Sequence, residues 1–93
     1  MYIIGDIGNT EVKICLFSKN KKLIKKIILN TNLINSKYLK ENLSTFIKKN
    51  KTINKIIFSS VVPKVYNLIN FYFTQILKIR CNEIKKLNLN KLI

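Results

Sequence analysis

The stretch that decides the fold is residues 2–17, YIIGDIGNTEVKICLF. An apolar run ends in a carboxylate at Asp6, passes through Gly8 and two small polar residues, and resumes with polar–apolar alternation. Apolar segments of this length on either side of a Gly-Asn turn predict two strands, over about residues 2–7 and 11–18. The chain therefore opens with a tight hairpin that carries a carboxylate beside its turn.

This turn has the composition of a phosphate-binding loop. Gly8 has no Cβ, so backbone N–H groups can approach anionic oxygens, and Asn9 and Thr10 add short side-chain donors. Asp6 repels phosphate directly, so its expected role is to hold a cation, or that cation's water shell, against the phosphates. The alternative is a hairpin in which these residues serve the turn geometry alone.

Two segments of the chain resemble the type III pantothenate kinase family. Residues 1–10, MYIIGDIGNT, are similar to the family's first motif, an apolar strand followed by D-[IV]-G-N-T. Residues 55–63, KIIFSSVVP, are similar to the second motif, in the same order and at about the usual distance. Gly5 departs from the bulky apolar residue usual at its position, which we expect to weaken the strand slightly. The family's N-P…G-A-D-R segment is not found in the sequence.

The resemblance implies an α/β fold, the N-terminal half of an actin-like (ribonuclease H-like) kinase. Residues 1–93 are then a single partial domain, the N-terminal ATPase-like subdomain. The implied reaction transfers the γ-phosphate of ATP to pantothenate, the first step of coenzyme A biosynthesis. Asp6, Gly8, Asn9 and Thr10 are the implied ATP phosphate-binding residues, and Asp6 is also the indirect metal ligand.

The resemblance also implies cofactors and an assembly. The cofactors are ATP, a divalent cation (Mg²⁺) and a monovalent cation (K⁺ or ammonium), and the intact protein is expected to be a homodimer. The family's catalytic base is the aspartate of the G-A-D-R segment, which lies beyond residue 93. We therefore expect the 93 residues to contain no catalytic residue and to be inactive alone, as the N-terminal portion of a longer kinase.

Two other functions stay open on the sequence. One is a non-catalytic regulatory or binding protein similar to Bvg accessory factor, whose sequences overlap with this family. The other is a small basic nucleic-acid-binding protein, because 18 Lys+Arg against 4 Asp+Glu give a net charge of +14. Arg80 is the single arginine, however, and base readout favours the planar fork of arginine. We expect no specific nucleic-acid binding.

The cysteines and the hydropathy of the chain indicate its cellular location. Cys15 and Cys81 are isolated, without the C-x-x-C spacing of zinc or redox motifs, and there is no histidine. Cys15 is expected to be a small apolar filler in a core strand. The start has no basic segment before an apolar one, and no apolar run approaches the roughly 18–20 residues of a membrane span. These features predict a cytoplasmic protein without membrane contact.

The remaining apolar runs predict the rest of the fold, in the order β-β-β-α-β-α-β. The predicted elements are a strand at 23–29 (or a short helix), a helix at 36–49 capped by Ser36, a break at 50–52, a strand at 53–58 with both faces covered, a turn at 59–63, a helix at about 64–77 and a strand at 80–87.

Side chains on these elements give a predicted core and a secondary site. The first helix should bury Leu39, Leu43, Phe46 and Ile47, and the second Val65, Leu68, Ile69, Tyr72 and Ile76. Ser59 and Ser60 follow a strand and could approach a ligand at its carboxyl end. Capping of the helix that starts at Pro63 is the favoured interpretation of these two serines.

Overall fold

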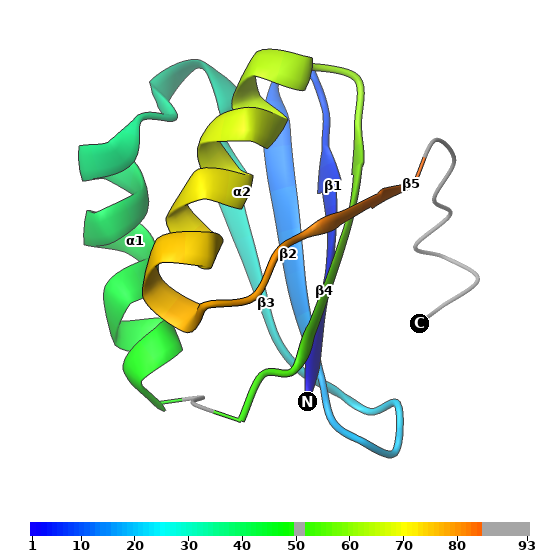
Figure 1. The fold of residues 1–93 in the computed structure, drawn as a ribbon. Helices are drawn as coiled ribbons and strands as arrows, with labels where there is room; N and C mark the ends of the chain where they lie inside the picture. Colours follow the sequence, from blue (N-terminus) through cyan, green and yellow to red (C-terminus); the bar gives the residue numbers. More distant parts are fainter. Residues whose placement is uncertain (50–51, 85–93) are drawn as a thin grey trace.

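A computed structural model, which describes residues 1–49 and 52–84, shows a mixed α/β domain (Figure 1). The elements are β1 (Tyr2–Ile7), β2 (Glu11–Phe17), β3 (Leu23–Asn30), η1 (Thr31–Leu33), α1 (Ser36–Lys49), β4 (Lys55–Ser60), α2 (Pro63–Leu77) and β5 (Asn82–Ile84). Apart from the short 3₁₀ helix η1, the elements follow the order expected from the sequence.

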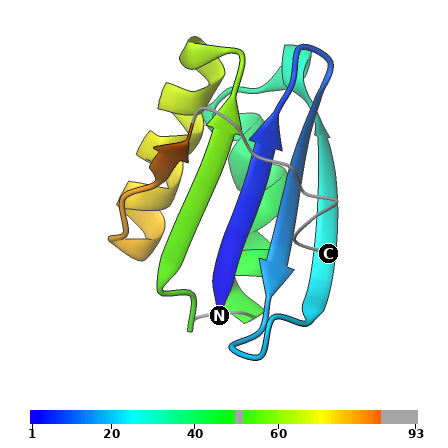
Figure 2. The same ribbon diagram turned by 90° about the vertical axis from the view of Figure 1, so that its right-hand side faces the viewer.

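The strands form one five-stranded sheet in the order β3-β2-β1-β4-β5. Figure 2 shows β1 in the middle, with β2 on one side and β4 on the other. The β1–β2 and β2–β3 pairs are antiparallel, whereas β1–β4 and β4–β5 are parallel. Antiparallel neighbours need only a tight turn, while parallel neighbours need a crossover, which α1 and α2 supply. The first strand of the chain is therefore the centre of the sheet.

Both helices pack on the same face of the sheet (Figure 1). Successive strand residues point to opposite faces, so each strand contributes to two different surfaces. The covered face, which packs against the helices, carries the fully buried residues Ile3, Ile7, Val12, Ile14, Leu16, Ile56 and Phe58. The helix-free face carries a smaller cluster formed by Tyr2, Ile4, Cys15 and Phe17. In β4, Ile57 is only half-buried, so the helix-free face is less completely covered there than the sequence predicted.

Gly5 belongs to the covered face, and its neighbour Phe58 in β4 accounts for the absence of a side chain at this position. A Cβ built on Gly5 would overlap the ring carbons of Phe58, which fills the space above the glycine. The sequence alone indicated a slight weakening of the strand at this position. The structure instead shows an exchange of volume, in which a large ring on β4 occupies the place of a side chain on β1.

The segment before α1 differs in detail from the prediction. Residues 23–30 form a strand, so the alternative of a short helix is wrong. Ser36 is the first residue of α1 and not its cap. The capping group is Asn35, whose side-chain oxygen accepts a hydrogen bond from the Tyr38 N–H at 2.8 Å. Asn and Ser are both favoured caps, so sequence preference alone does not choose between neighbours. The predicted buried face of α1 is confirmed.

The second half of the chain shows two further corrections. β4 runs to Ser60, two residues beyond the predicted strand, because both serines pair with the end of β1. In α2 the predicted buried face is partly wrong: Phe73, which was not predicted, is fully buried, whereas Ile76 is 53% exposed and Leu68 is only half-buried. Apolar residues surround this helix on several sides, so helical periodicity does not identify the buried face.

The last predicted elements lie partly outside the described residues. β5 covers Asn82–Ile84 of the strand expected at 80–87, and residues 85–87 lie outside the described part. The predicted break after α1 also falls largely on residues 50 and 51, which are outside it. In the part of the chain that the structure describes, neither helix is long and apolar enough to cross a membrane.

Candidate functional site

The β1–β2 turn is held by a short backbone hydrogen bond. The Gly8 N–H donates to the Glu11 carbonyl at 2.9 Å, so Asn9 and Thr10 stand at the tip. Both tip residues are exposed. Gly8 does not have a positive φ, so the turn does not need a glycine for its backbone conformation. A Cβ at Gly8 would lie 3.2 Å from the Glu11 carbonyl oxygen, and this crowding favours glycine at the position.

Three polar side chains lie in a row beside this turn, one from each of three neighbouring strands. In the β1–β2 register Asp6 is opposite Lys13, and in the β1–β4 register Asp6 is opposite Ser59. Directly paired residues share a face of the sheet. The Ser59–Asp6–Lys13 row therefore lies on the helix-free face, with Asp6 two residues before Gly8. The row brings together a hydroxyl, a carboxylate and an ammonium group, in that order.

Lys13 is the site residue that sequence reasoning missed. The hairpin register could have identified Lys13 from the sequence. Asp6 and Lys13 are equally far from the turn centre between Asn9 and Thr10, so they are paired across the hairpin. Among the described residues the ion pair present is Lys37 Nζ with Glu41 Oε1 at 4.0 Å. Asp6 and Lys13 thus face the same surface without neutralising each other through direct contact.

Ser59 closes the β4 side of the row, Ser60 lies on the covered face opposite Ile7, and neither serine caps α2. Ser59 is a buried residue within β4. The Ser60 hydroxyl oxygen accepts a hydrogen bond from the Val62 N–H at 3.0 Å. Val62 is the N-cap of α2 and makes no side-chain capping bond, so the favoured interpretation of these serines as helix caps is wrong. Pro63 starts the helix, as expected.

A backbone bond ties the two strand ends together at this edge. The Val61 N–H donates to the Ile7 carbonyl at 3.0 Å, which continues the β1–β4 pairing beyond the strands. The Gly8 turn and the segment that follows Ser60 are therefore neighbours. Of the predicted site residues, the structure places Asp6 and Ser59 side by side in the sheet and sets Gly8, Asn9 and Thr10 directly after β1.

Asp6 at the end of β1 and Glu11 at the start of β2 are the carboxylates at this edge, and Asp6 is the one within the row. No group of three or more His, Cys, Asp and Glu residues occurs among the described residues, so a protein-only metal cage is not formed by that part of the chain. Mg²⁺ in nucleotide sites is held by one or two carboxylates, by water and by the phosphates themselves. A carboxylate beside the Gly8 turn, such as Asp6, fits that donor set.

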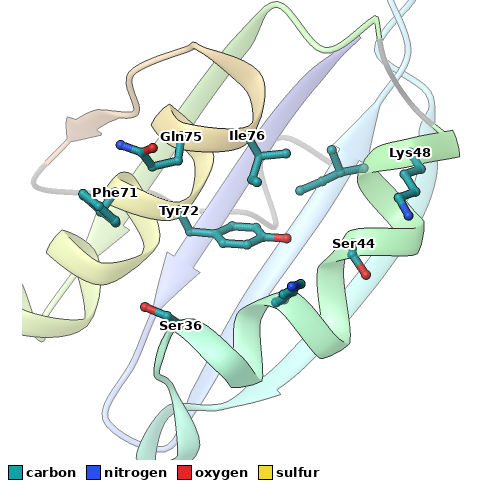
Figure 3. A pocket seen from close by; sticks show the side chains of 9 residues that line it. Ser36, Ser44, Lys48, Phe71, Tyr72, Gln75 and Ile76 are labelled. Carbon is teal, nitrogen blue, oxygen red and sulfur yellow. The ribbon is translucent and has the colours of Figure 1, made fainter.

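A separate groove of about 440 Å³ lies between α1 and α2 (Figure 3). Tyr72 reaches across it towards α1, and Phe71 and Ile76 stand at its side with 61% and 53% of their surface exposed. Burial raises the pKa of the Tyr72 hydroxyl. Every residue that lines this groove belongs to a helix, and none is a carboxylate. The groove does not have the chemistry of the strand-end site.

The two cysteines are buried thiols on opposite sides of the sheet. Cys15 belongs to the cluster on the helix-free face, and Cys81 packs into the larger core. Burial raises the pKa of Cys81 to about 12. Burial also raises the pKa of Cys15, while the charges of Lys26 and Lys13 act in the opposite direction. Both thiols are free, and the burial of Cys15 agrees with its predicted place in a core strand.

Comparison with known sequences places the chain among the phosphotransferases. The family described as type III pantothenate kinase matches residues 2–92. The chain therefore belongs to the type III pantothenate kinase family, which confirms the resemblance found in its two motifs. A relative named type III pantothenate kinase, from Pelagibacter ubique (strain HTCC1062), is 53% identical over 93 residues. The match covers 100% of this chain and 38% of that relative.

Proposed function

We propose that this chain is the ATP-phosphate-binding part of a pantothenate kinase, which moves the γ-phosphate of ATP to the pantothenate hydroxyl. The observation that carries the proposal is the Ser59–Asp6–Lys13 row beside the Gly8 turn. Membership of the kinase family supports the reaction class, and the name of the Pelagibacter relative supports pantothenate as the substrate.

Each member of the site has a distinct role in this proposal. Phosphoryl transfer depends mainly on positioning and on stabilising the charge that spreads over the phosphate oxygens. Asp6 holds Mg²⁺ or its water against the phosphates, and the ammonium of Lys13 neutralises negative charge from the neighbouring strand. Asn9 and Thr10 supply backbone and side-chain donors, and Gly8 lets the phosphates approach a turn without a Cβ. Ser59 bounds the site on the β4 side, and Ser60 holds the adjoining segment through its bond to the Val62 N–H.

The wider assignments belong to the same proposal. The sheet order β3-β2-β1-β4-β5, with two antiparallel pairs followed by parallel ones, supports an actin-like, ribonuclease H-like subdomain. We also propose a monovalent cation, K⁺ or ammonium, a homodimer for the intact protein, and a cytoplasmic location. A Bvg accessory factor-like regulator and a nucleic-acid-binding protein are the alternatives that the experiments below distinguish.

ATP titrations of the 93-residue chain, with and without Mg²⁺, test the site directly. Amide NMR signals of residues 8–11 should shift on addition of MgATP. Asp6→Asn should remove the difference between ATP and MgATP, because the amide lacks the charge that holds the cation. Glu41→Gln, a matched exposed carboxylate on α1, should behave like the wild type. Shifts confined to other residues, or an unchanged Mg²⁺ effect in Asp6→Asn, would contradict the proposed site.

The intact protein provides the catalytic test. There, Asp6→Asn should lower kcat by about 100-fold, a typical cost of losing one charge-stabilising group, with little change in pantothenate binding. The 93-residue chain should show no phosphorylation above a control without enzyme, because the base implied by the family lies in the G-A-D-R segment. A folded Asp6→Asn enzyme with unchanged kcat at saturating ATP and cation would reduce Asp6 to a turn residue. Tight binding of one DNA sequence over random competitor would favour the nucleic-acid-binding alternative.

A further inference from the structure

Thr31 lies beside the Gly8 turn although it is distant in sequence. It starts η1, between β3 and α1, and is only 6% exposed. Its hydroxyl donates to the Gly8 carbonyl at 2.9 Å, and its N–H donates to the Thr10 carbonyl at 3.0 Å. One buried residue therefore holds the carbonyls on both sides of Asn9.

These two hydrogen bonds determine where the turn can direct its own donors. In a planar trans peptide the carbonyl of one residue and the N–H of the next point in opposite directions. All peptide bonds among the described residues are trans. Drawing the Gly8 carbonyl towards Thr31 therefore aims the Asn9 N–H away from it. Drawing in the Thr10 carbonyl does the same for the Glu11 N–H.

Thr31 is itself held in place by the junction around it. The Asn30 side-chain oxygen accepts a hydrogen bond from the Asn32 N–H at 2.9 Å and so closes the turn over Thr31. The Asn30 N–H donates to the Tyr38 hydroxyl at 3.0 Å, which connects the junction to α1. The Gly8 turn is thus supported by residues 30–32, which are bonded to α1 and lie outside the D-[IV]-G-N-T motif.

We propose that Thr31 is the positioning residue of the phosphate-binding turn. It does not touch the phosphate, but it fixes the two peptide planes that aim backbone N–H donors at it. Backbone N–H donors that are already ordered in the free protein bind an anion without a further loss of conformational entropy. The inference rests on the proposed function and adds a residue from outside both sequence motifs to the site.

The test compares, in the 93-residue chain, a substitution that removes the hydroxyl with one that keeps it. Thr31→Val removes the hydroxyl but keeps the shape and the backbone N–H, whereas Thr31→Ser keeps the hydroxyl. Thr45→Val, at an exposed threonine of α1, is the matched control. The readouts are the ¹⁵N order parameter of Asn9 and the MgATP affinity from NMR titration, measured after circular dichroism has confirmed the fold.

Thr31→Val should lower the Asn9 order parameter from about 0.85, typical of rigid backbone, to below about 0.6. It should weaken MgATP binding about tenfold, the effect of losing one hydrogen bond. Thr31→Ser should restore both values, which a loss of packing alone does not explain. Unchanged order in Thr31→Val, or lower order with unchanged affinity, would overturn the inference.

Two outcomes separate this inference from the proposed function. If the wild-type chain binds no MgATP, the proposed site fails in this chain, and the order parameters alone decide whether Thr31 positions the turn. If Thr31→Val does not fold, Thr31→Ala replaces it, because a smaller side chain relieves any crowding by the second methyl group. An Asn9 order parameter equal to that of the wild type in Thr31→Ala would then overturn the inference.

Discussion

The two faces of the sheet are built from the same strands but have different compositions. On the covered face the strand residues are almost entirely apolar and fully buried against α1 and α2. On the helix-free face the apolar cluster is small, and the same strands carry Asp6, Lys13 and Ser59 at their ends. Alternation along a strand thus separates the residues that stabilise the domain from those that form the site.

This difference means that adjacent residues should respond to substitution in opposite ways. Asp6 faces the site, whereas its neighbours Gly5 and Ile7 face the core. A change on the covered face should reduce the free energy of unfolding, and a change on the helix-free face should alter ligand binding at nearly constant stability. The predictions below test that separation, from the largest expected effect on stability to the smallest.

Phe58→Ala should have the largest effect, a loss of about 3–5 kcal/mol in the free energy of unfolding, as for other buried phenylalanines. Phe58 is fully buried and fills the space over Gly5. Urea denaturation followed by circular dichroism measures the loss. A cost below about 1 kcal/mol, the scale of a surface change, would contradict the packing described for the covered face.

Gly5→Ala tests the packing of the covered face through its energetic coupling to Phe58. Alone it should cost about 1–3 kcal/mol, because its methyl group overlaps the Phe58 ring and overpacked cores are strained. In a Phe58→Ala background the cost should shrink or reverse, since the ring is gone. A double-mutant cycle from four urea curves gives the coupling. Strictly additive costs would mean that Gly5 is kept for another reason.

The pH dependence of stability should report the buried thiol of the covered face. Because the pKa of Cys81 is raised from 9.0 to about 12, the folded protein keeps this proton where the unfolded chain loses it. Stability from this group is therefore complete below pH 9.0 and falls as the pH rises towards about 12. The Cys81→Ala variant, with all lysines retained, should show a shallower fall in the free energy of unfolding. Parallel curves for the two proteins would exclude a contribution from Cys81.

The capping residue of α1 gives a smaller effect. Asn35→Ala should cost about 1 kcal/mol, because its side-chain oxygen accepts the Tyr38 N–H at the helix start. Ser36→Ala is the control, since Ser36 lies inside the helix and should change stability by less than about 0.5 kcal/mol. Thermal unfolding of both variants decides between the two residues. A larger cost for Ser36→Ala than for Asn35→Ala would support Ser36 as the cap, as the sequence predicted.

Substitutions on the helix-free face should have the smallest effect on stability. Asp6→Asn and Lys13→Met should each change the free energy of unfolding by no more than about 0.5 kcal/mol, because both side chains are only half-buried. Lys13→Met should nevertheless weaken MgATP binding, whereas Lys19→Met in the distant β2–β3 turn should not. A large loss of stability in either site variant would break the separation between the two faces.

Much of the fold could be predicted from local sequence patterns, and the errors arise where distant segments decide. The hairpin of residues 2–17 and the buried face of α1 depend on periodicity within one element, and both agree with the structure. Ser59 and Ser60 follow an apolar run and look like a turn. Their parallel pairing with β1, which lies far away in sequence, makes them part of β4.

The candidate site shows the same limit. Asp6 and Gly8 are recognisable because they adjoin a glycine turn, but Lys13 becomes a site residue only through its register with Asp6. Thr31 is further removed, since it reaches the turn through the β2–β3 pairing and the start of η1. Phe73 and Ile76 illustrate a different difficulty, because α2 is apolar on several sides and only the sheet defines its inner face.

The central position of β1 has a consequence for how the chain acquires its shape during synthesis. β1 can pair with β2 as soon as the hairpin has emerged, but its other edge must wait for β4, with β3 and α1 in between. At synthesis rates of about 5–20 residues per second, that edge stays open for seconds. An open edge offers unpaired N–H and C=O groups to any other strand. The nascent protein thus carries the Gly8 turn early, on a half-built sheet exposed to mispairing, and should need chaperones most during that interval.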